Sequence, residues 1–134
     1  MDKVVKCKDL PYSRYEIENL KATAEEFKKA NAAATSAKAV EAAYRKYLAE
    51  EEKYGTFASL AYTRYTLNTK DEYYIGEQNY YDEIGPVASA ISTEIGNLLL
   101  DSPFRAELEP LFPETFFKNL ECARKAHNEK TVAS

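Results

Sequence analysis

Apolar residues recur every three or four positions along much of the chain, which is the spacing of one face of an α-helix. The longest series alternates steps of four and three over eight positions: Val40, Tyr44, Tyr47, Glu51, Tyr54, Ala58, Ala61 and Tyr65. It predicts a helix over residues 36–67 with one continuous seam, which only Glu51 interrupts. Gly55 lies inside this helix, and there we expect another backbone to approach closely, because glycine otherwise weakens a helix interior.

A second series begins a few residues later and also runs over eight positions: Tyr74, Glu77, Tyr81, Ile84, Ala88, Ile91, Ile95 and Leu98. It predicts a helix over residues 70–100, with a face widened by Tyr73, Tyr80 and Val87. Pro86 lies inside this stretch and should kink the helix, because proline removes one backbone hydrogen bond. The two long helices are expected to fold back on each other as an antiparallel hairpin.

Two tyrosine pairs, at 73–74 and 80–81, stand among five carboxylates: Asp71, Glu72, Glu77, Asp82 and Glu83. Such a pattern suits either a metal or acid–base site, or a helix face that is buried. The seven-residue interval between the pairs is the repeat of a helix seam. It favours packing of the rings in a protein interior, with the hydroxyl groups at the edge of the seam facing water or a partner.

Three shorter helices complete the prediction. Residues 13–16 have the sequence of a capping box, in which serine and glutamate side chains accept hydrogen bonds from free backbone amides, so a helix should start there. A short helix is expected over residues 103–109, and Pro113 should open the last helix. Glycine is scarce, and residues that favour helices are abundant. The predicted fold is all-α: an elongated helical bundle of about five helices, built on the long antiparallel hairpin, in a single domain over residues 1–134.

The chain carries a net charge of −4, and its Lys and Arg residues are scattered among acids. Nucleic-acid binders normally gather basic residues in a patch, so that class is disfavoured. No apolar run approaches the roughly 20 residues that span a bilayer, and the first residues do not resemble a secretory signal. We therefore expect a cytoplasmic protein without nucleic-acid or membrane partners. Cys7 and Cys122 are expected to be reduced thiols, with a disulfide between them as the alternative.

The sequence offers few groups for chemistry. A carboxylate-bridged metal pair in a helical bundle needs Glu-x-x-His units, and a zinc hydrolase needs His-Glu-x-x-His; neither motif occurs. The one histidine, His127, lies near the chain end, so a catalytic set with Ser59 or Cys122 is a weak candidate. We therefore predict that this chain supplies no catalytic residue, no metal ligand and no cofactor of its own.

One polar pair has a predicted structural role. When the two long helices fold back, residues equidistant from the turn meet, so Arg64 falls near Tyr74 and Glu77. This placement predicts an Arg64–Glu77 ion pair close to the seam of the hairpin. Such a pair either lies at the surface and contributes little, or is buried and fixes the register of the hairpin.

Four segments, in order and at plausible spacings, resemble landmarks of one family: PYSRYEIENL (Pro11–Leu20), TRYTLNTKDEYY (Thr63–Tyr74), YYDEIGP (Tyr80–Pro86) and LLDSPFRAELE (Leu99–Glu109). The chain resembles, from Lys8 to about Lys125, the N-terminal region of the oligoendopeptidase F group, which are zinc-dependent peptidases of the thimet-oligopeptidase type. The resemblance implies a longer all-helical enzyme whose His-Glu-x-x-His zinc motif lies in a C-terminal part. It also implies that the N-terminal helices form a wall of a deep cleft that admits short peptides.

None of the zinc-binding or general-base positions of that family exists in this sequence. The resemblance therefore implies the N-terminal domain, a cleft wall or lid, of such a peptidase: inactive alone, with zinc only in the full-length relative. The implied partners are the missing C-terminal catalytic domain and, for the full-length relative, short peptides. The wide apolar faces of two long helices also predict self-association through exposed patches. The alternatives are a stand-alone helical protein–protein interaction module and, third, an enzyme that uses tyrosine and carboxylate acid–base pairs.

Overall fold

The computed structural model describes residues 12–133, and in this range it contains helices and no strand. The elements follow in the order α1 (Ile17–Ala33), α2 (Ala37–Leu67), α3 (Glu72–Leu100), α4 (Arg105–Leu108), the 3-10 helix η2 (Glu109–Leu111) and α5 (Phe116–Ala133). The all-α prediction is therefore confirmed, and the two longest helices occupy the stretches where the two apolar series run.

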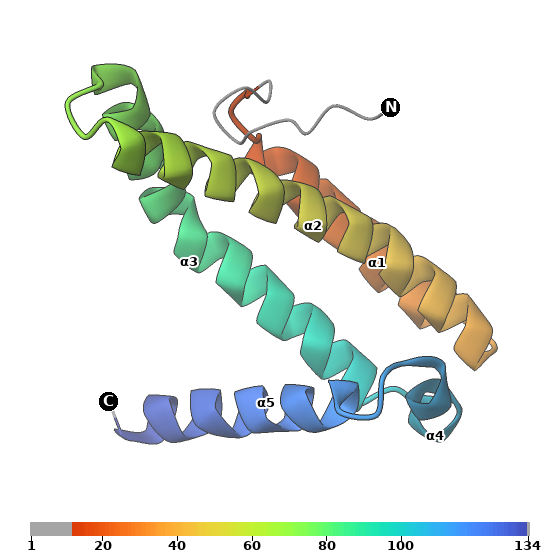
Figure 1. The fold of residues 1–134 in the computed structure, drawn as a ribbon. Helices are drawn as coiled ribbons and strands as arrows, with labels where there is room; N and C mark the ends of the chain where they lie inside the picture. The colour runs from red at the N-terminus through yellow and green to blue at the C-terminus, as the bar shows by residue number, and fades with distance from the viewer. Residues whose placement is uncertain (1–11, 134) are drawn as a thin grey trace.

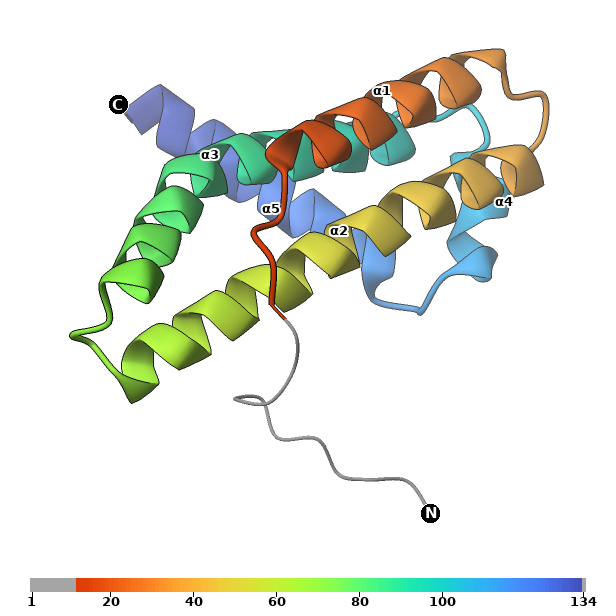
Figure 2. The ribbon, with the colours of Figure 1, turned by 90° about the horizontal axis from the view of Figure 1, so that it is seen from above.

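The long helices α2 and α3 form the predicted antiparallel hairpin, and α1 lies beside α2 along much of its length (Figure 1). α1 also contacts α3, so the first three helices pack against one another. α5 crosses the end of α3, and the short α4 and η2 make the connection between them (Figures 1 and 2). The result is an elongated bundle with a hairpin at its centre.

The two predicted seams supply a large part of the core. Buried side chains come from each of α1 to α5 and from Phe112, which follows η2: Ile17, Leu20, Ala24, Phe27, Val40, Tyr44, Tyr47, Ala61, Tyr81, Ile84, Ala88, Ile95, Leu99, Leu100, Leu108, Phe112 and Phe117. Removing one large side chain such as Phe27 from water contributes roughly 1.5–3 kcal/mol. The interpretation of the spaced tyrosines and isoleucines as interior residues is therefore confirmed for Tyr44, Tyr47, Tyr81, Ile84 and Ile95, whereas Tyr54 and Ile91 are partly buried.

Two residues that were expected to widen the face of α3 are instead exposed. The exposed fraction is 56% for Tyr73 and 38% for Val87. Both lie to the side of the heptad positions, and the other helices do not reach far enough around α3 to cover them. The apolar face of α3 is therefore narrower than the sequence pattern suggested.

The close backbone approach expected at Gly55 is wrong, because a methyl group built there would meet nothing within 4 Å. A tight contact occurs at Gly96 instead, where the same methyl group would lie 3.2 Å from Cδ2 of the Leu120 side chain. Gly96 is the position on α3 over which α5 crosses. Packing therefore requires a glycine at position 96, where α3 contacts α5, and not at position 55.

α3 continues through Pro86 as one helix. Proline lacks the backbone N–H that would donate to the preceding turn, which permits the helix to bend there. α3 changes direction along its course, as both ribbon views show (Figures 1 and 2). The bend allows its first half to follow α2 while its second half reaches α5.

The helix starts were only partly predicted. Ser36 precedes α2, and its hydroxyl accepts a hydrogen bond from the amide of Ala39 at 3.2 Å, as expected for a cap. The capping box at residues 13–16 is wrong: α1 begins at Ile17, and the side chain of Glu16 makes no capping hydrogen bond. The physical reason lies in the contacts of the segment that precedes α1.

Candidate functional site

A polar cluster fastens the segment before α1 to α3, and the carboxylate of Glu77 is at its centre. Arg14 donates to Oε2 of Glu77 through Nη2 at 2.6 Å and through Nε at 3.1 Å. The hydroxyl of Tyr12 donates to Oε1 at 2.7 Å. The side chain of Glu77 is 4% exposed and that of Arg14 is 44% exposed. A buried anion on α3 is therefore neutralised by a cation that is open to water.

Burial and hydrogen bonding have opposite effects on the pKa of Glu77. Burial raises this pKa, but the hydrogen bonds from Arg14 and Tyr12 together lower it by more than burial raises it. The pKa of Glu77 therefore lies below its ordinary value of 4.5. Burial, with the bonds to Tyr81 and Glu77, raises the pKa of the Tyr12 hydroxyl. The carboxylate therefore stays charged and the hydroxyl keeps its proton, which suits a fixed structural contact.

The hydroxyl groups of the second tyrosine pair take the place of the predicted capping box. Tyr81 accepts a hydrogen bond from the amide of Tyr15 at 3.0 Å, and Tyr80 accepts one from the amide of Ile17 at 3.3 Å. The Tyr80 hydroxyl also donates to the carbonyl of Tyr15 at 2.8 Å. These bonds satisfy backbone groups around the start of α1, which would otherwise lack partners. They hold residues 12–16 outside the helix.

The cluster extends to α2 through Tyr15, whose side chain is almost fully buried. Its hydroxyl donates to Oε2 of Glu50 at 2.7 Å. Burial, together with this bond, raises the pKa of Tyr15, so its hydroxyl remains a donor. We call this group the Glu77 cluster, defined as Tyr12, Arg14, Tyr15, Glu50, Glu77, Tyr80 and Tyr81.

Arg64 lies at the same end of the hairpin, and its Nη1 donates to the hydroxyl of Tyr74 at 3.0 Å, as the hairpin register predicts. Its guanidinium group also lies 5.9 Å from the ring centre of Tyr12. Glu77, however, is paired with Arg14 and not with the expected Arg64. The cation beside Glu77 is Arg14, from the segment that precedes α1. The sequence pattern did not indicate that this segment packs against the hairpin.

Sequence reasoning missed Tyr12, Arg14 and Tyr15 as members of this cluster because it assigned their segment to the start of a helix. Their contacts with α3 join residues 63 to 69 positions apart, and a single sequence contains no signal for pairing at that distance. The nearest clue is the prediction that the tyrosine hydroxyls face a partner at the edge of the seam. That partner is the backbone before α1.

The candidate catalytic and metal-binding groups can be followed only as far as the described residues reach. Among the described residues, no three His, Cys, Asp or Glu side chains gather closely enough to hold a metal ion. Ser59 and Cys122 are both exposed, on α2 and α5. The side chain of His127 and all of Cys7 lie outside the described residues, so the expectations about them stay predictions. Within residues 12–133, no helix has the length and apolar character needed to cross a bilayer.

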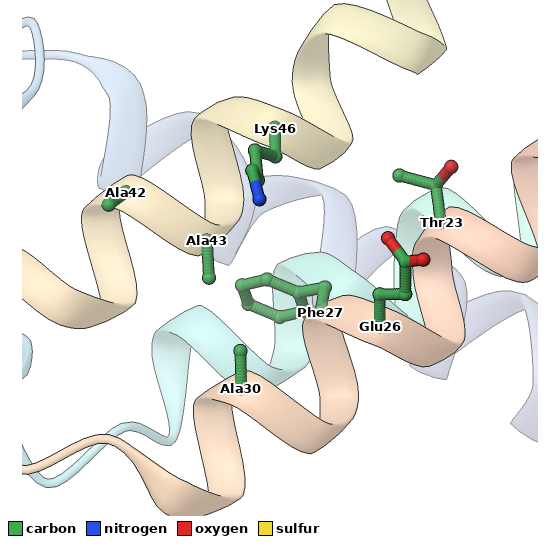
Figure 3. A pocket seen from close by; sticks show the side chains of 7 residues that line it. All are labelled: Thr23, Glu26, Phe27, Ala30, Ala42, Ala43 and Lys46. Atoms are coloured by element: carbon green, nitrogen blue, oxygen red, sulfur yellow. The ribbon is translucent and has the colours of Figure 1, made fainter.

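A hollow of about 260 Å³ lies between α1 and α2. Figure 3 shows the ring of Phe27 between these helices, near the small side chains of Ala30 and Ala43. Glu26 and Lys46 are the charged residues that line it. The small alanine side chains leave space beside the Phe27 ring. We therefore interpret the hollow as a gap in the packing of α1 against α2, not as a binding site.

The described structure is thus an all-helical domain in which polar and aromatic residues bind the segments together. Compared with known protein families, residues 7–127 of this chain match the Peptidase M3 N-terminal domain. The chain belongs to this family, and the resemblance recognised in its four segments is confirmed.

Solved structures with the same fold come from peptidases. The chain is similar to an oligoendopeptidase F at 32% identity and a TM-score of 0.83, covering 88% of this chain and 21% of that one. It is similar to an oligoendopeptidase F from Bacillus anthracis strain Ames at 31% identity and a TM-score of 0.81, covering 86% and 21%. A PZ peptidase A with an inhibitor gives 29% identity, a TM-score of 0.83 and coverage of 87% and 21%. The search of curated proteins gives no match.

Proposed function

We propose that this chain acts as the N-terminal helical domain of a zinc-dependent peptidase of the oligoendopeptidase F type, folding as a single domain over residues 1–134. In the assembled enzyme it forms a wall or lid of the cleft that receives short peptides. The observation that carries the proposal is the family match over residues 7–127, together with coverage of only 21% of a similar oligoendopeptidase F chain.

The zinc ion of such an enzyme activates the water that attacks the peptide bond. The described residues of this chain do not fit a zinc site, since no suitable group of ligands gathers among them. The zinc ligands and the general base therefore belong to a catalytic portion of the peptidase. This chain forms part of the cleft wall. Its hairpin, which the Glu77 cluster fastens to the segment before α1, narrows the cleft so that only short, unfolded peptides enter.

Exposed aromatic and aliphatic side chains near the tip of the hairpin support the proposed self-association of the isolated chain. Tyr62 and Tyr73 are each 56% exposed, and Leu67 is 66% exposed. Apolar side chains grouped in this way drive association when nothing covers them. The same residues are the observation that favours the second candidate function, a stand-alone helical interaction module. Either activity is proposed to take place in the cytoplasm.

Mixing this chain with a truncated peptidase distinguishes the peptidase domain from the stand-alone interaction module. The chain is combined with an oligoendopeptidase F polypeptide that lacks the matching N-terminal region, and cleavage of a short fluorogenic peptide is followed with zinc present. We expect the mixture to cleave the peptide and each component alone to be much slower. A polypeptide that cleaves equally well without the chain would contradict the proposal. Binding without any gain in cleavage would favour the interaction module.

A further inference from the structure

Glu51 is the one charged residue in the apolar seam of α2, and its side chain is partly buried. Its Oε1 accepts a hydrogen bond from the hydroxyl of Ser92 on α3 at 3.1 Å. No residue of the described chain forms an ion pair with it, and the positions one turn away on α2 carry no cation. A partly buried carboxylate whose donors are neutral hydroxyl groups is stabilised less than one paired with a cation.

Glu51 lines a hollow of about 330 Å³ between α1, α2 and α3. α3 contributes three hydroxyl groups to its lining, from Ser89, Ser92 and Thr93, and α2 contributes the phenol of Tyr54. The hollow therefore has one anionic group surrounded by neutral hydroxyl groups. These groups can accept hydrogen bonds from a guanidinium or ammonium group that enters the hollow.

The buried hydroxyl of Tyr47 is a neighbour of Glu51. Tyr47 is only 1% exposed, and its hydroxyl makes no hydrogen bond of good geometry within the described part of the chain. Burial, next the charge of Glu51, and then a hydrogen-bond contact with its carboxylate raise the pKa of Tyr47. A buried hydroxyl without a partner is costly.

An adjoining hollow of about 510 Å³ follows the outer face of α3, and it shares Ser89 and Thr93 with the Glu51 hollow. Its lining is rich in small side chains, which allow another helix to lie close. Its two acids already have cations: Glu94 pairs with Lys28 at 2.8 Å, and Asp101 pairs with Arg124 at 2.9 Å. Of the acids that line these two hollows, Glu51 is the one without a cation in the described structure.

We infer that the Glu51 hollow receives an arginine or lysine side chain of the peptidase's catalytic portion, from a helix that lies along α3. The inference rests on the proposed function, and it names the docking surface: the α3 face next to Glu51. The small residues fix the approach of the helix. The carboxylate selects the charge of the side chain that enters, and the surrounding hydroxyl groups complete its hydrogen bonds.

The test compares the isolated chain with a chimera in which it replaces the matching region of an oligoendopeptidase F. Glu51→Gln removes the charge and keeps the size. In the isolated chain we expect it to leave the thermal unfolding midpoint unchanged or to raise it, because an unpaired charge is lost. In the chimera we expect it to lower the midpoint by about 2–4 °C, because a paired charge is lost. Glu52→Gln, at an exposed neighbour, should change neither midpoint.

An equal fall of the midpoint in both proteins would overturn the inference, and so would an unchanged chimera. A chimera that folds and does not cleave peptides would contradict the proposed function alone, since the contrast between the midpoints still reports docking.

A second measurement uses the isolated chain with methylguanidinium as the probe, followed by NMR. Saturable shifts at Ser92 and Tyr54 that disappear in Glu51→Gln are expected, and the absence of saturation would also overturn the inference.

Discussion

The Arg14 guanidinium and the Glu77 carboxylate are 2.6 Å apart, although 63 positions separate them in the sequence. Their contact brings the segment before α1 onto the first half of α3. Because Tyr80 and Tyr81 bind the backbone of the same segment, the start of α1 is positioned by side chains of α3. The orientation of α1 relative to the hairpin therefore depends on this cluster as well as on apolar packing.

The Arg14–Glu77 contact should show measurable coupling in a double-mutant cycle of Arg14→Ala and Glu77→Ala. We expect a coupling energy of about 1–2 kcal/mol in denaturant unfolding, below the value for a fully buried pair because Arg14 is partly open to solvent. The matched cycle of Arg64→Ala with Glu77→Ala should give a smaller coupling, since the Glu77 carboxylate is paired with Arg14. A larger coupling for Arg64 than for Arg14 would contradict the structure.

Acid should weaken the protein through Glu77. Because the pKa of Glu77 is lowered in the folded state, the unfolded chain binds its proton first, and stability falls as the pH drops. The contribution is full above about pH 4.5 and is lost as the pH passes through the lowered pKa. Glu77→Gln should therefore be less stable than wild type near neutral pH, with a difference that shrinks below pH 4.5. A difference that stays constant in acid would refute this prediction.

The hydroxyl groups at the start of α1 should contribute to stability. Tyr81→Phe leaves the buried amide of Tyr15 without its partner, and we expect a loss of about 1–2 kcal/mol in the free energy of unfolding. Tyr62→Phe removes a hydroxyl from an exposed ring and serves as the control, with a change near zero. Equal effects of the two substitutions would show that the Tyr81 hydroxyl does not cap this segment.

The two glycines should respond to alanine in opposite ways. Gly55→Ala introduces a methyl group into open space within α2, so it should stabilise the protein by roughly 0.5–1 kcal/mol. At Gly96 the methyl group would lie 3.2 Å from Leu120, and this crowding should cancel or reverse that gain. Thermal unfolding of both variants measures the difference. A greater gain at position 96 would contradict the crossing of α3 and α5.

The sequence predicted the parts of the fold that depend on local periodicity. The heptad steps through Tyr44, Tyr47 and Tyr81 located the buried seams, because helix geometry alone places such residues on one face. Residues 13–16 were wrongly predicted to start a helix. Their local sequence is that of a capping box, but hydrogen bonds to the distant Tyr80 and Tyr81 hold them outside α1. Gly55 was misjudged for a related reason: which helix approaches which glycine is decided by tertiary packing.

The direct test of the proposed function is peptide cleavage by the chimera with oligoendopeptidase F. Its rate is compared with that of the same enzyme lacking the N-terminal region, at equal zinc and with folding checked by circular dichroism. We predict that this chain restores cleavage of short peptides, and that the deleted enzyme is much slower. Equal rates for the two proteins, or a folded chimera without activity, would contradict the assignment of this chain as the peptidase's N-terminal domain.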